Sequence, residues 1–163
     1  MVKKQLSFRD ADIADIPHLV AMLADDELGK TRERVGLPLD QRYLDAFHAM
    51  DQDPNHRLVV GEVAGEVDSE VNSEIVAMLQ LSFLPGLSRL GACRGQIESV
   101  RVARQHRSLG YGALAFRWAI EQCRKNDCNL VQLTSDITRT EAHRFYANLD
   151  FKATHTGYKL LLK

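Results

Sequence analysis

The chain has 163 residues, is poor in cysteine, proline and tryptophan, and is almost uncharged overall. Its 21 lysines and arginines nearly balance 22 aspartates and glutamates, which leaves a formal net charge of -1. That balance argues against a nucleic-acid-binding protein that relies on a broad basic face. No apolar run approaches the roughly 20 residues that a membrane-spanning helix needs. We therefore expect neither a nucleic-acid partner nor a membrane association.

The chain also lacks the signals of secretion and of a metal site. Cys123 and Cys128 do not stand at zinc-ligand spacing, and no paired histidine motif complements them. The first residues include two lysines but no apolar core or cleavage site typical of a signal peptide. Three cysteines without a secretion signal are typical of reduced thiols in the cytosol. These features predict a cytoplasmic protein without a bound metal.

What is present is typical of a globular domain. Hydrophobic residues make up 45% and charged residues 26% of the chain, which are ordinary values for such a domain. The length suits one domain with a sizeable core. No linker or low-complexity segment divides it, so we expect a single domain over residues 1–163.

Apolar periodicity and turn residues predict the order of strands and helices. Asp15 and Asp40 are expected to cap two helices, a third helix is expected over 113–125, and Thr138 with Glu141 would open a fourth as a capping box. The acidic segment 64–73 is expected to form an extended, exposed hairpin tip. Strands are expected at 5–9, 57–63, 74–83, 96–102, 129–134, 151–155 and 158–162.

Short turns join the second, third and fourth of these strands, which is typical of an antiparallel meander. The helix between the fourth and fifth strands requires a parallel pair. The expected fold class is therefore α/β, with a mixed, mostly antiparallel seven-stranded sheet and helices on both faces.

A short basic and glycine-containing turn, Arg107 to Gly112 (RSLGYG), lies between a strand and a helix. The first N–H groups of a helix have no intrahelical partner and carry the positive end of its dipole. Gly110 and Gly112 leave room for a ligand near the backbone, and Arg107 can add a charged contact. The turn predicts a phosphate or pyrophosphate site, although an ordinary tight turn has the same pattern. It matches neither the Walker motif nor the dinucleotide fingerprint.

Two separated segments resemble the GNAT superfamily of N-acetyltransferases. Ile97 to Leu114 (IESVRVARQHRSLGYGAL) resembles its acetyl-CoA-binding motif, Gln/Arg-x-x-Gly-x-Gly/Ala after a V-x-V strand. Ala142 to Phe151 (AHRFYANLDF) resembles its A-h-x-F-Y-x-x-x-G-F segment. The region from Thr134 to Tyr146 is also similar to aminoalkylphosphonate N-acetyltransferases. The chain departs from the family pattern at Ala77, Arg139 and Asp150.

The resemblance implies an acetyl-CoA-dependent N-acetyltransferase and a set of site residues. The backbone around Val100 to Val102 would pair with pantetheine as an added strand does, and the Val102 N–H would donate to the thioester carbonyl. Tyr146 stands where the family often has a tyrosine near the CoA sulfur. The residues implied to bind acetyl-CoA are Val100, Val102, Arg107, Leu109, Gly110, Tyr111, Gly112 and Ala113.

The acceptor chemistry adds a candidate base. An alkyl amine is mostly protonated at neutral pH, so a carboxylate or a water chain must take its proton. Glu98 precedes the thioester-binding segment and is our candidate, although a structural ion pair would also explain it. Tyr146 is the candidate acid for the departing thiolate, or else a core aromatic.

The expected acceptor is a primary amine of a small molecule, attacked directly within a ternary complex. A protein lysine or N-terminus, or a regulatory acyl-CoA-binding module without catalysis, are the alternatives. A homodimer is plausible for this family. The expected walls of the acceptor site are the segments 25–34 and 84–94 and the last hairpin.

Overall fold

The computed structural model describes residues 6–26, 29–67 and 70–162, with the backbone alone described for residues 65–67 and 70–72. The chain falls into two units, one ending at Gln132 and the other beginning at Leu133. Among the described residues, the first unit contains the sheet and four helices, and the second contains one helix and an extended segment.

The first unit is built on a five-stranded sheet in the order β1-β2-β3-β4-β5. The first four strands pair antiparallel with their neighbours, and β4 pairs parallel with β5. This arrangement confirms the mixed, mostly antiparallel sheet and the five expected strands that lie within it. The strands are β1 (Leu6–Asp10), β2 (His56–Val67), β3 (Glu70–Pro85), β4 (Cys93–Val102) and β5 (Cys128–Gln132).

The expected sixth and seventh strands are absent from the described residues, so the prediction of a seven-stranded sheet is wrong. Residues 151–162 form no helix or strand. Their alternating apolar side chains, such as Tyr158 and Leu160, are 92% and 84% exposed. A two-stranded hairpin without a buried face is at best marginally stable in water, and the apolar side chains of this segment are not buried.

Besides three short 3-10 turns, five α-helices complete the part of the chain that the structure describes. They are α1 (Ile16–Ala24), α2 (Gln41–Asp51), the single turn α3 (Ser88–Gly91), α4 (Tyr111–Lys125) and α5 (Thr140–Ala147). Asp40 caps α2 as expected, because its carboxylate accepts from the Arg42 N–H at 3.2 Å. α4 begins two residues before the expected start, so that Gly112 belongs to its first turn.

Two expected caps are not formed. Asp15 does not cap α1, because its carboxylate accepts from the Asp12 N–H within a preceding 3-10 turn and binds Arg9. The capping box at the start of α5 is also absent. There the Thr138 hydroxyl donates to Asp136 at 2.6 Å, and α5 begins only at Thr140.

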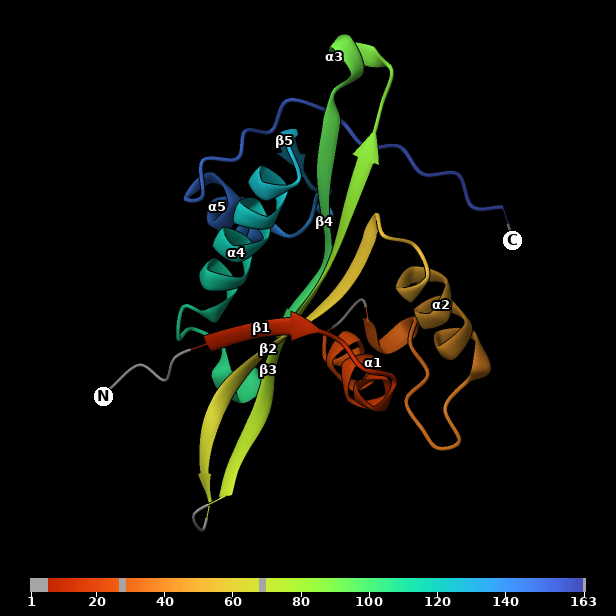
Figure 1. The fold of residues 1–163 in the computed structure, drawn as a ribbon, viewed down its shortest axis with the longest axis vertical. Coiled ribbons are helices and arrows are strands. Elements are labelled where there is room, and N and C mark those ends of the chain that lie inside the picture. Colours follow the sequence, from red (N-terminus) through yellow and green to blue (C-terminus); the bar gives the residue numbers. More distant parts are fainter. Residues whose placement is uncertain (1–5, 27–28, 68–69, 163) are drawn as a thin grey trace. The chain divides into compact units, whose positions relative to one another are not determined.

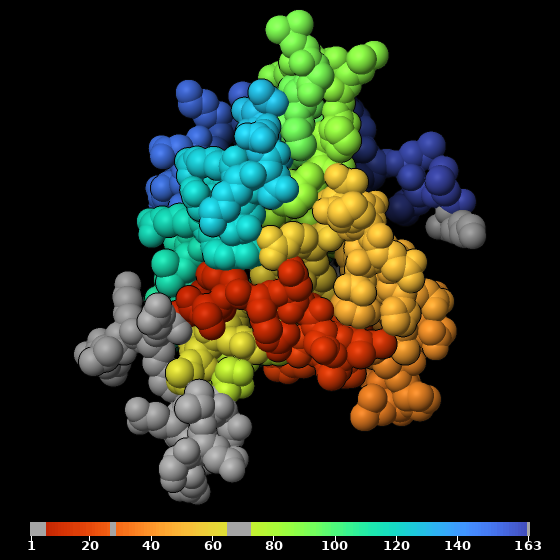
Figure 2. All heavy atoms as spheres, in the orientation of Figure 1, coloured from red at the N-terminus to blue at the C-terminus, as the bar shows by residue number. Residues whose placement is uncertain are grey.

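Helices cover both faces of the sheet, as expected (Figure 1). On one face, α1 and α2 form an apolar cluster with Val60 of β2 and Met78 of β3. On the other face, Tyr111 of α4 packs against Val76 and Ala77 of β3. The space-filling view shows β1 and α1 in red directly beside α2 in orange (Figure 2). The first unit therefore has a two-sided core, and β3 is its central strand.

The β2–β3 hairpin continues past β1, which pairs only with Val59 to Val63 of β2 (Figure 1). The extended hairpin tip expected over 64–73 is confirmed in the described residues, which pair from Ala64 with Ser73 to Val67 with Glu70. Residues 68–69 lie outside the described residues.

Candidate functional site

The turn before α4 has the backbone geometry of a helix N-terminus that is open to a ligand. Gly110 is the N-cap and has a φ of 87°, in the left-handed region that glycine adopts without a Cβ clash. The Leu114 N–H donates to the Gly110 carbonyl at 3.2 Å. The three preceding N–H groups, from Tyr111 to Ala113, have no carbonyl within the helix to bind. The Tyr111 side chain is 6% exposed and anchors this turn in the core.

The strand before this turn has an open edge. β4 pairs with β5 only from Cys93 to Gln96, so Ile97 to Val102 extend beyond the pairing. The Ala103 N–H donates to Val76 of β3 at 2.9 Å. Because main-chain groups of successive strand residues alternate between the two edges, those of Val102 and Val100 face away from β3. They therefore lie on the edge where another extended group could pair.

A bulge at Ser99 decides where the next side chains point. Met78 pairs with Arg101 and Gln80 pairs with Glu98, so two residues of β4 lie opposite one residue of β3. Ser99 has a φ of 53°, in the left-handed region. Since Met78 and Gln80 share a face of β3, Glu98 and Arg101 also share that face, which is the one that α1 and α2 cover. Glu98 is exposed there.

Both carbonyls on the open edge of β4 are bound by arginine side chains. The Val100 carbonyl accepts from Arg101 Nη1 at 3.0 Å. The Val102 carbonyl accepts from Arg107 Nε at 3.1 Å. Arg107 therefore lies beside the end of β4 as well as within the glycine turn.

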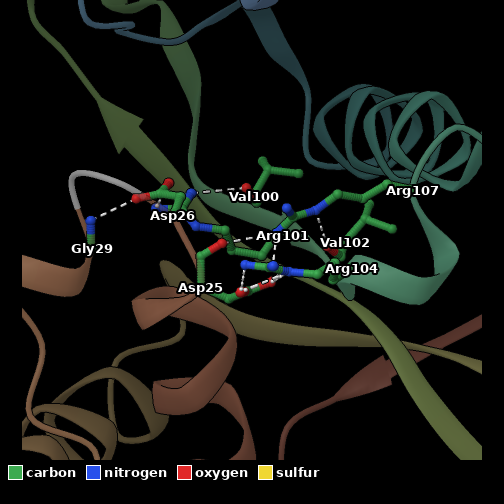
Figure 3. A network of polar contacts seen from close by, with 8 residues as sticks. All are labelled: Asp25, Asp26, Gly29, Val100, Arg101, Val102, Arg104 and Arg107. Carbon is green, nitrogen blue, oxygen red and sulfur yellow. Dashed lines mark hydrogen bonds and ion pairs between the residues drawn. The ribbon is translucent and has the colours of Figure 1, made fainter.

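Two aspartates after α1 hold the arginines around this site (Figure 3). Arg104 Nη2 and Arg107 Nη2 bind the Asp25 carboxylate at 2.6 and 2.9 Å, and Arg107 Nη2 also donates to the Asp25 carbonyl. Asp26 pairs with Arg101 at 3.2 Å. The hydrogen bond from Arg104, together with attraction by both arginines, lowers the pKa of Asp25. The carboxylate therefore stays ionised and links the end of α1 to the turn.

The structure brings most of the sequence-predicted site residues together in the first unit. Glu98, Val100 and Val102 lie on β4, and Arg107 with the residues Leu109 to Ala113 forms the turn and the start of α4. Tyr146 lies on α5 in the second unit, where its ring contacts those of Phe145 and Phe151. The predicted place of Tyr146 near the cofactor sulfur stays a prediction.

Sequence reasoning missed the role of the Asp25 and Asp26 pair. Asp25 is 82 residues from Arg107, and a charged segment after a helix is more often solvated. The spacing of Arg101, Arg104 and Arg107 at three-residue intervals was the available signal, because it places three cations at the end of one strand.

Among the described residues, no group of three or more histidine, cysteine or acidic side chains is arranged to hold a metal. Within the same residues, no helix has the length and apolar character to span a membrane.

An open strand edge followed by a glycine-capped helix start can hold an extended ligand that carries a phosphate group. The family model described as acetyltransferase (GNAT) family matches residues 21–151. The chain therefore belongs to the GNAT family, whose members use acetyl-CoA as co-substrate.

Three relatives illustrate the similarity. An aminoalkylphosphonate N-acetyltransferase from Salmonella typhimurium is 33% identical over 61 residues, which are 37% of this chain and 40% of that relative's length. The crystal structure of a transcriptional regulator from Bacillus halodurans C-125 is 40% identical, with a TM-score of 0.88 over 97% of this chain and 100% of that one. An acetyltransferase from Clostridium acetobutylicum with acetyl-CoA is 16% identical, with a TM-score of 0.70 over 97% of each chain, and so shares the fold.

Proposed function

We propose that this chain is an N-acetyltransferase that transfers the acetyl group of acetyl-CoA to a primary amine of a small molecule. The whole chain, residues 1–163, would act as one N-acetyltransferase domain. The observation that carries the proposal is the continuation of β4 past β5 into the Gly110-capped start of α4. Membership of the GNAT family supports acetyl transfer as the reaction class.

We assign to the cofactor residues the roles that the resemblance implies. The main-chain groups of Val100 and Val102 on the open edge of β4 would pair with the pantetheine arm. The free N–H groups from Leu109 through Gly110, Tyr111, Gly112 and Ala113 would hold the pyrophosphate at the positive end of α4. Arg107 is tied by Nε and Nη2, and Nη1 makes no hydrogen bond with another described residue. That nitrogen is available to an anion.

Glu98 is proposed as the general base. An alkyl amine has a pKa of ~10.4, so reaching its neutral form at pH 7 costs about 4–5 kcal/mol at ~1.36 kcal/mol per unit. A carboxylate near the amine takes that proton and lowers this cost. Glu98 is exposed and precedes the bulge, and its carboxylate has no hydrogen bond or ion pair with another described residue. A structural ion pair therefore does not explain it.

The transfer is proposed to be direct, without an acyl-enzyme. As the amine attacks, charge grows on the thioester oxygen, and the Val102 N–H would donate to it. Tyr146 is the proposed acid for the leaving thiolate. Burial raises the pKa of Cys123, and burial together with neighbouring thiols raises the pKa of Cys128 to about 12. Thiols with raised pKa values are poor nucleophiles, which disfavours these two cysteines as acyl carriers.

The small-molecule acceptor is supported by the Salmonella relative, whose name specifies an aminoalkylphosphonate. A protein lysine or N-terminus is the alternative acceptor, and a homodimer is the proposed assembly.

A regulatory acyl-CoA-binding module without catalysis is the second candidate function. It is favoured by the Bacillus halodurans relative, which is described as a transcriptional regulator.

The test is thiol release from acetyl-CoA with a panel of small amines and a lysine peptide, next to direct measurement of acetyl-CoA binding. Glu98→Gln is expected to lower kcat/KM about 100-fold at neutral pH and less at alkaline pH, where the amine is already neutral. Glu121→Gln, on the exposed face of α4, is the matched control. Binding of acetyl-CoA without thiol release for any amine would favour the regulatory module.

A further inference from the structure

The sheet face that carries Glu98 changes character along its length. Where α1 and α2 cover it, the strands present apolar side chains such as Val60 and Met78. Beyond Met78 the same face becomes polar. Cross-strand pairing places two rows of polar residues there, His56, Ser82, Gln96 and Gln132 in one row and Gln80 with Glu98 in the next.

This assignment of faces follows from one close contact. Gly95 lies against Cys123 of α4, where a Cβ would come within 3.2 Å of the Cys123 Cβ. Gly95 therefore faces α4. Side chains alternate along a strand, so Arg94, Gln96 and Glu98 all face the opposite side, toward the polar rows.

The polar rows are ordered and partly buried. The Gln132 amide donates to the Gln96 side-chain oxygen at 2.8 Å, and His56 Nδ1 lies 2.8 Å from the Ser82 hydroxyl. Ser82 is only 3% exposed. Sheet faces that serve only as core are apolar, because burying a polar group without a partner is unfavourable. A half-buried polar face beside the candidate base therefore suits a polar ligand better than a packed helix.

Arg94 is the unusual residue of this face. It is half-buried, and its side chain makes no hydrogen bond or ion pair with another residue of the described chain. Arg101, Arg104 and Arg107 are each held by an aspartate. Fully buried arginines are usually paired with an anion, and the guanidinium of the half-buried Arg94 is available to bind one from a ligand.

Glu98 and Arg94 place opposite charges at the two ends of the face. They are four residues apart on one strand, so their Cα atoms are separated by roughly 13 Å at ~3.3 Å per residue. Both side chains point to the same side and can lean toward each other. The complementary ligand has an ammonium group at one end and an anionic group at the other.

We propose that the acceptor is an amine that also carries an acidic group, with the amine at Glu98 and the acidic group bound by Arg94. This inference rests on the proposed acetyl transfer. Polar atoms between the two charges would bond to Gln96 and its neighbours. A simple alkylamine would leave Arg94 without a partner, and a diamine would bring a second cation against it.

The test uses amines of one length that differ only in the far group. They are 5-aminopentanoate, pentylamine and 1,5-diaminopentane, together with the corresponding eight-carbon series, assayed by thiol release from acetyl-CoA. For at least one length, the amino acid is expected to exceed the other two in kcat/KM by about tenfold or more. Arg94→Gln should remove this preference, and Arg94→Glu should reverse it toward the diamine.

Arg117→Glu is the matched control, because it makes the same charge change at an exposed position of α4 outside the expected walls of the acceptor site, and it should keep the wild-type preference. Circular dichroism and acetyl-CoA binding report whether each variant is folded. Equal kcat/KM for the three amines, or a preference that survives Arg94→Glu, would overturn the acidic-acceptor inference alone. Absence of thiol release with every amine would overturn the proposed function, and this inference with it.

Discussion

Replacing Gly95 by alanine should destabilise the protein, because α4 lies too close to β4 for a side chain. The new Cβ would overlap with Cys123 Sγ and lie 3.2 Å from the Cys123 Cβ, so turning the thiol away relieves only part of the crowding. Overpacking of this kind costs about 1–3 kcal/mol. The entropic advantage of alanine over glycine offsets about 0.5–1 kcal/mol. The midpoints of these two ranges leave a net loss of about 1 kcal/mol, or roughly 2–4 °C in Tm for a chain of this size.

A double-mutant cycle with Cys123→Ala isolates the cause. Cys123 is 1% exposed, so its truncation alone should cost about 1 kcal/mol. In the double variant the overlap with sulfur is gone, and the combined loss should be smaller than the sum by about 1 kcal/mol. Urea unfolding followed by circular dichroism measures each term. Gly86→Ala is the control, because its Cβ would meet only an ordinary contact at 3.4 Å. A Gly95→Ala variant as stable as wild type, or strictly additive losses, would refute the reasoning.

Three further predictions concern charge. Arg9→Met should cost about 1–2 kcal/mol at neutral pH, since it leaves two half-buried carboxylates without their cation. Burial raises the pKa of Asp15, but bonds from Arg9 and the Asp12 N–H outweigh it and lower the pKa overall. The stability from Arg9 is thus present above about pH 4 and lost as pH falls, so urea unfolding of the two proteins should converge in acid. The pKa of Cys128 is raised to about 12. The stability that its neutral thiol contributes is therefore complete below about pH 8.5 and declines as pH rises further. Urea unfolding should show that alkaline pH lowers the stability of wild type more than that of Cys128→Ser. Asp25→Asn should raise the KM for acetyl-CoA about two- to fivefold without changing that for the amine, because Arg107 loses its charged anchor; an unchanged KM would show that Asp25 does not position it.

Local sequence patterns are sufficient for the elements whose stability is local. Alternating apolar residues mark the five strands of the sheet, and Asp40 marks the start of α2 because a cap acts within three residues. The turn from Arg107 to Gly112 is visible for the same reason. The expected strands over 151–155 and 158–162 show the limit of local patterns. Alternation permits a strand, but pairing and a buried face are needed to form one.

The features that sequence patterns could not reveal depend on pairing across long distances. Asp25 meets Arg107 only because α1 packs on the face of the sheet where β4 ends. The expected cap at Asp15 is not formed because Arg9 and Asp12 compete for its carboxylate. Arg94 reads as a loop residue in the sequence because Gly95 interrupts the apolar pattern. Gly95 is the point where α4 approaches β4, and the strand already begins at Cys93, before this glycine.

The bulge at Ser99 is the feature on which the proposed geometry depends most directly. Before it, Glu98 faces the polar side of the sheet, and after it, Val100 and Val102 turn their main chain to the open edge. Deleting Ser99 removes the extra residue, so Glu98 and Arg101 can keep their partners Gln80 and Met78 in a regular ladder, while the local bend and twist of β4 are lost. Thiol release from acetyl-CoA should then fall to background. Ser99→Gly keeps the residue count and accepts the positive φ, so it should retain activity. A deletion variant as active as Ser99→Gly would show that the bulge is not needed to position the open edge of β4.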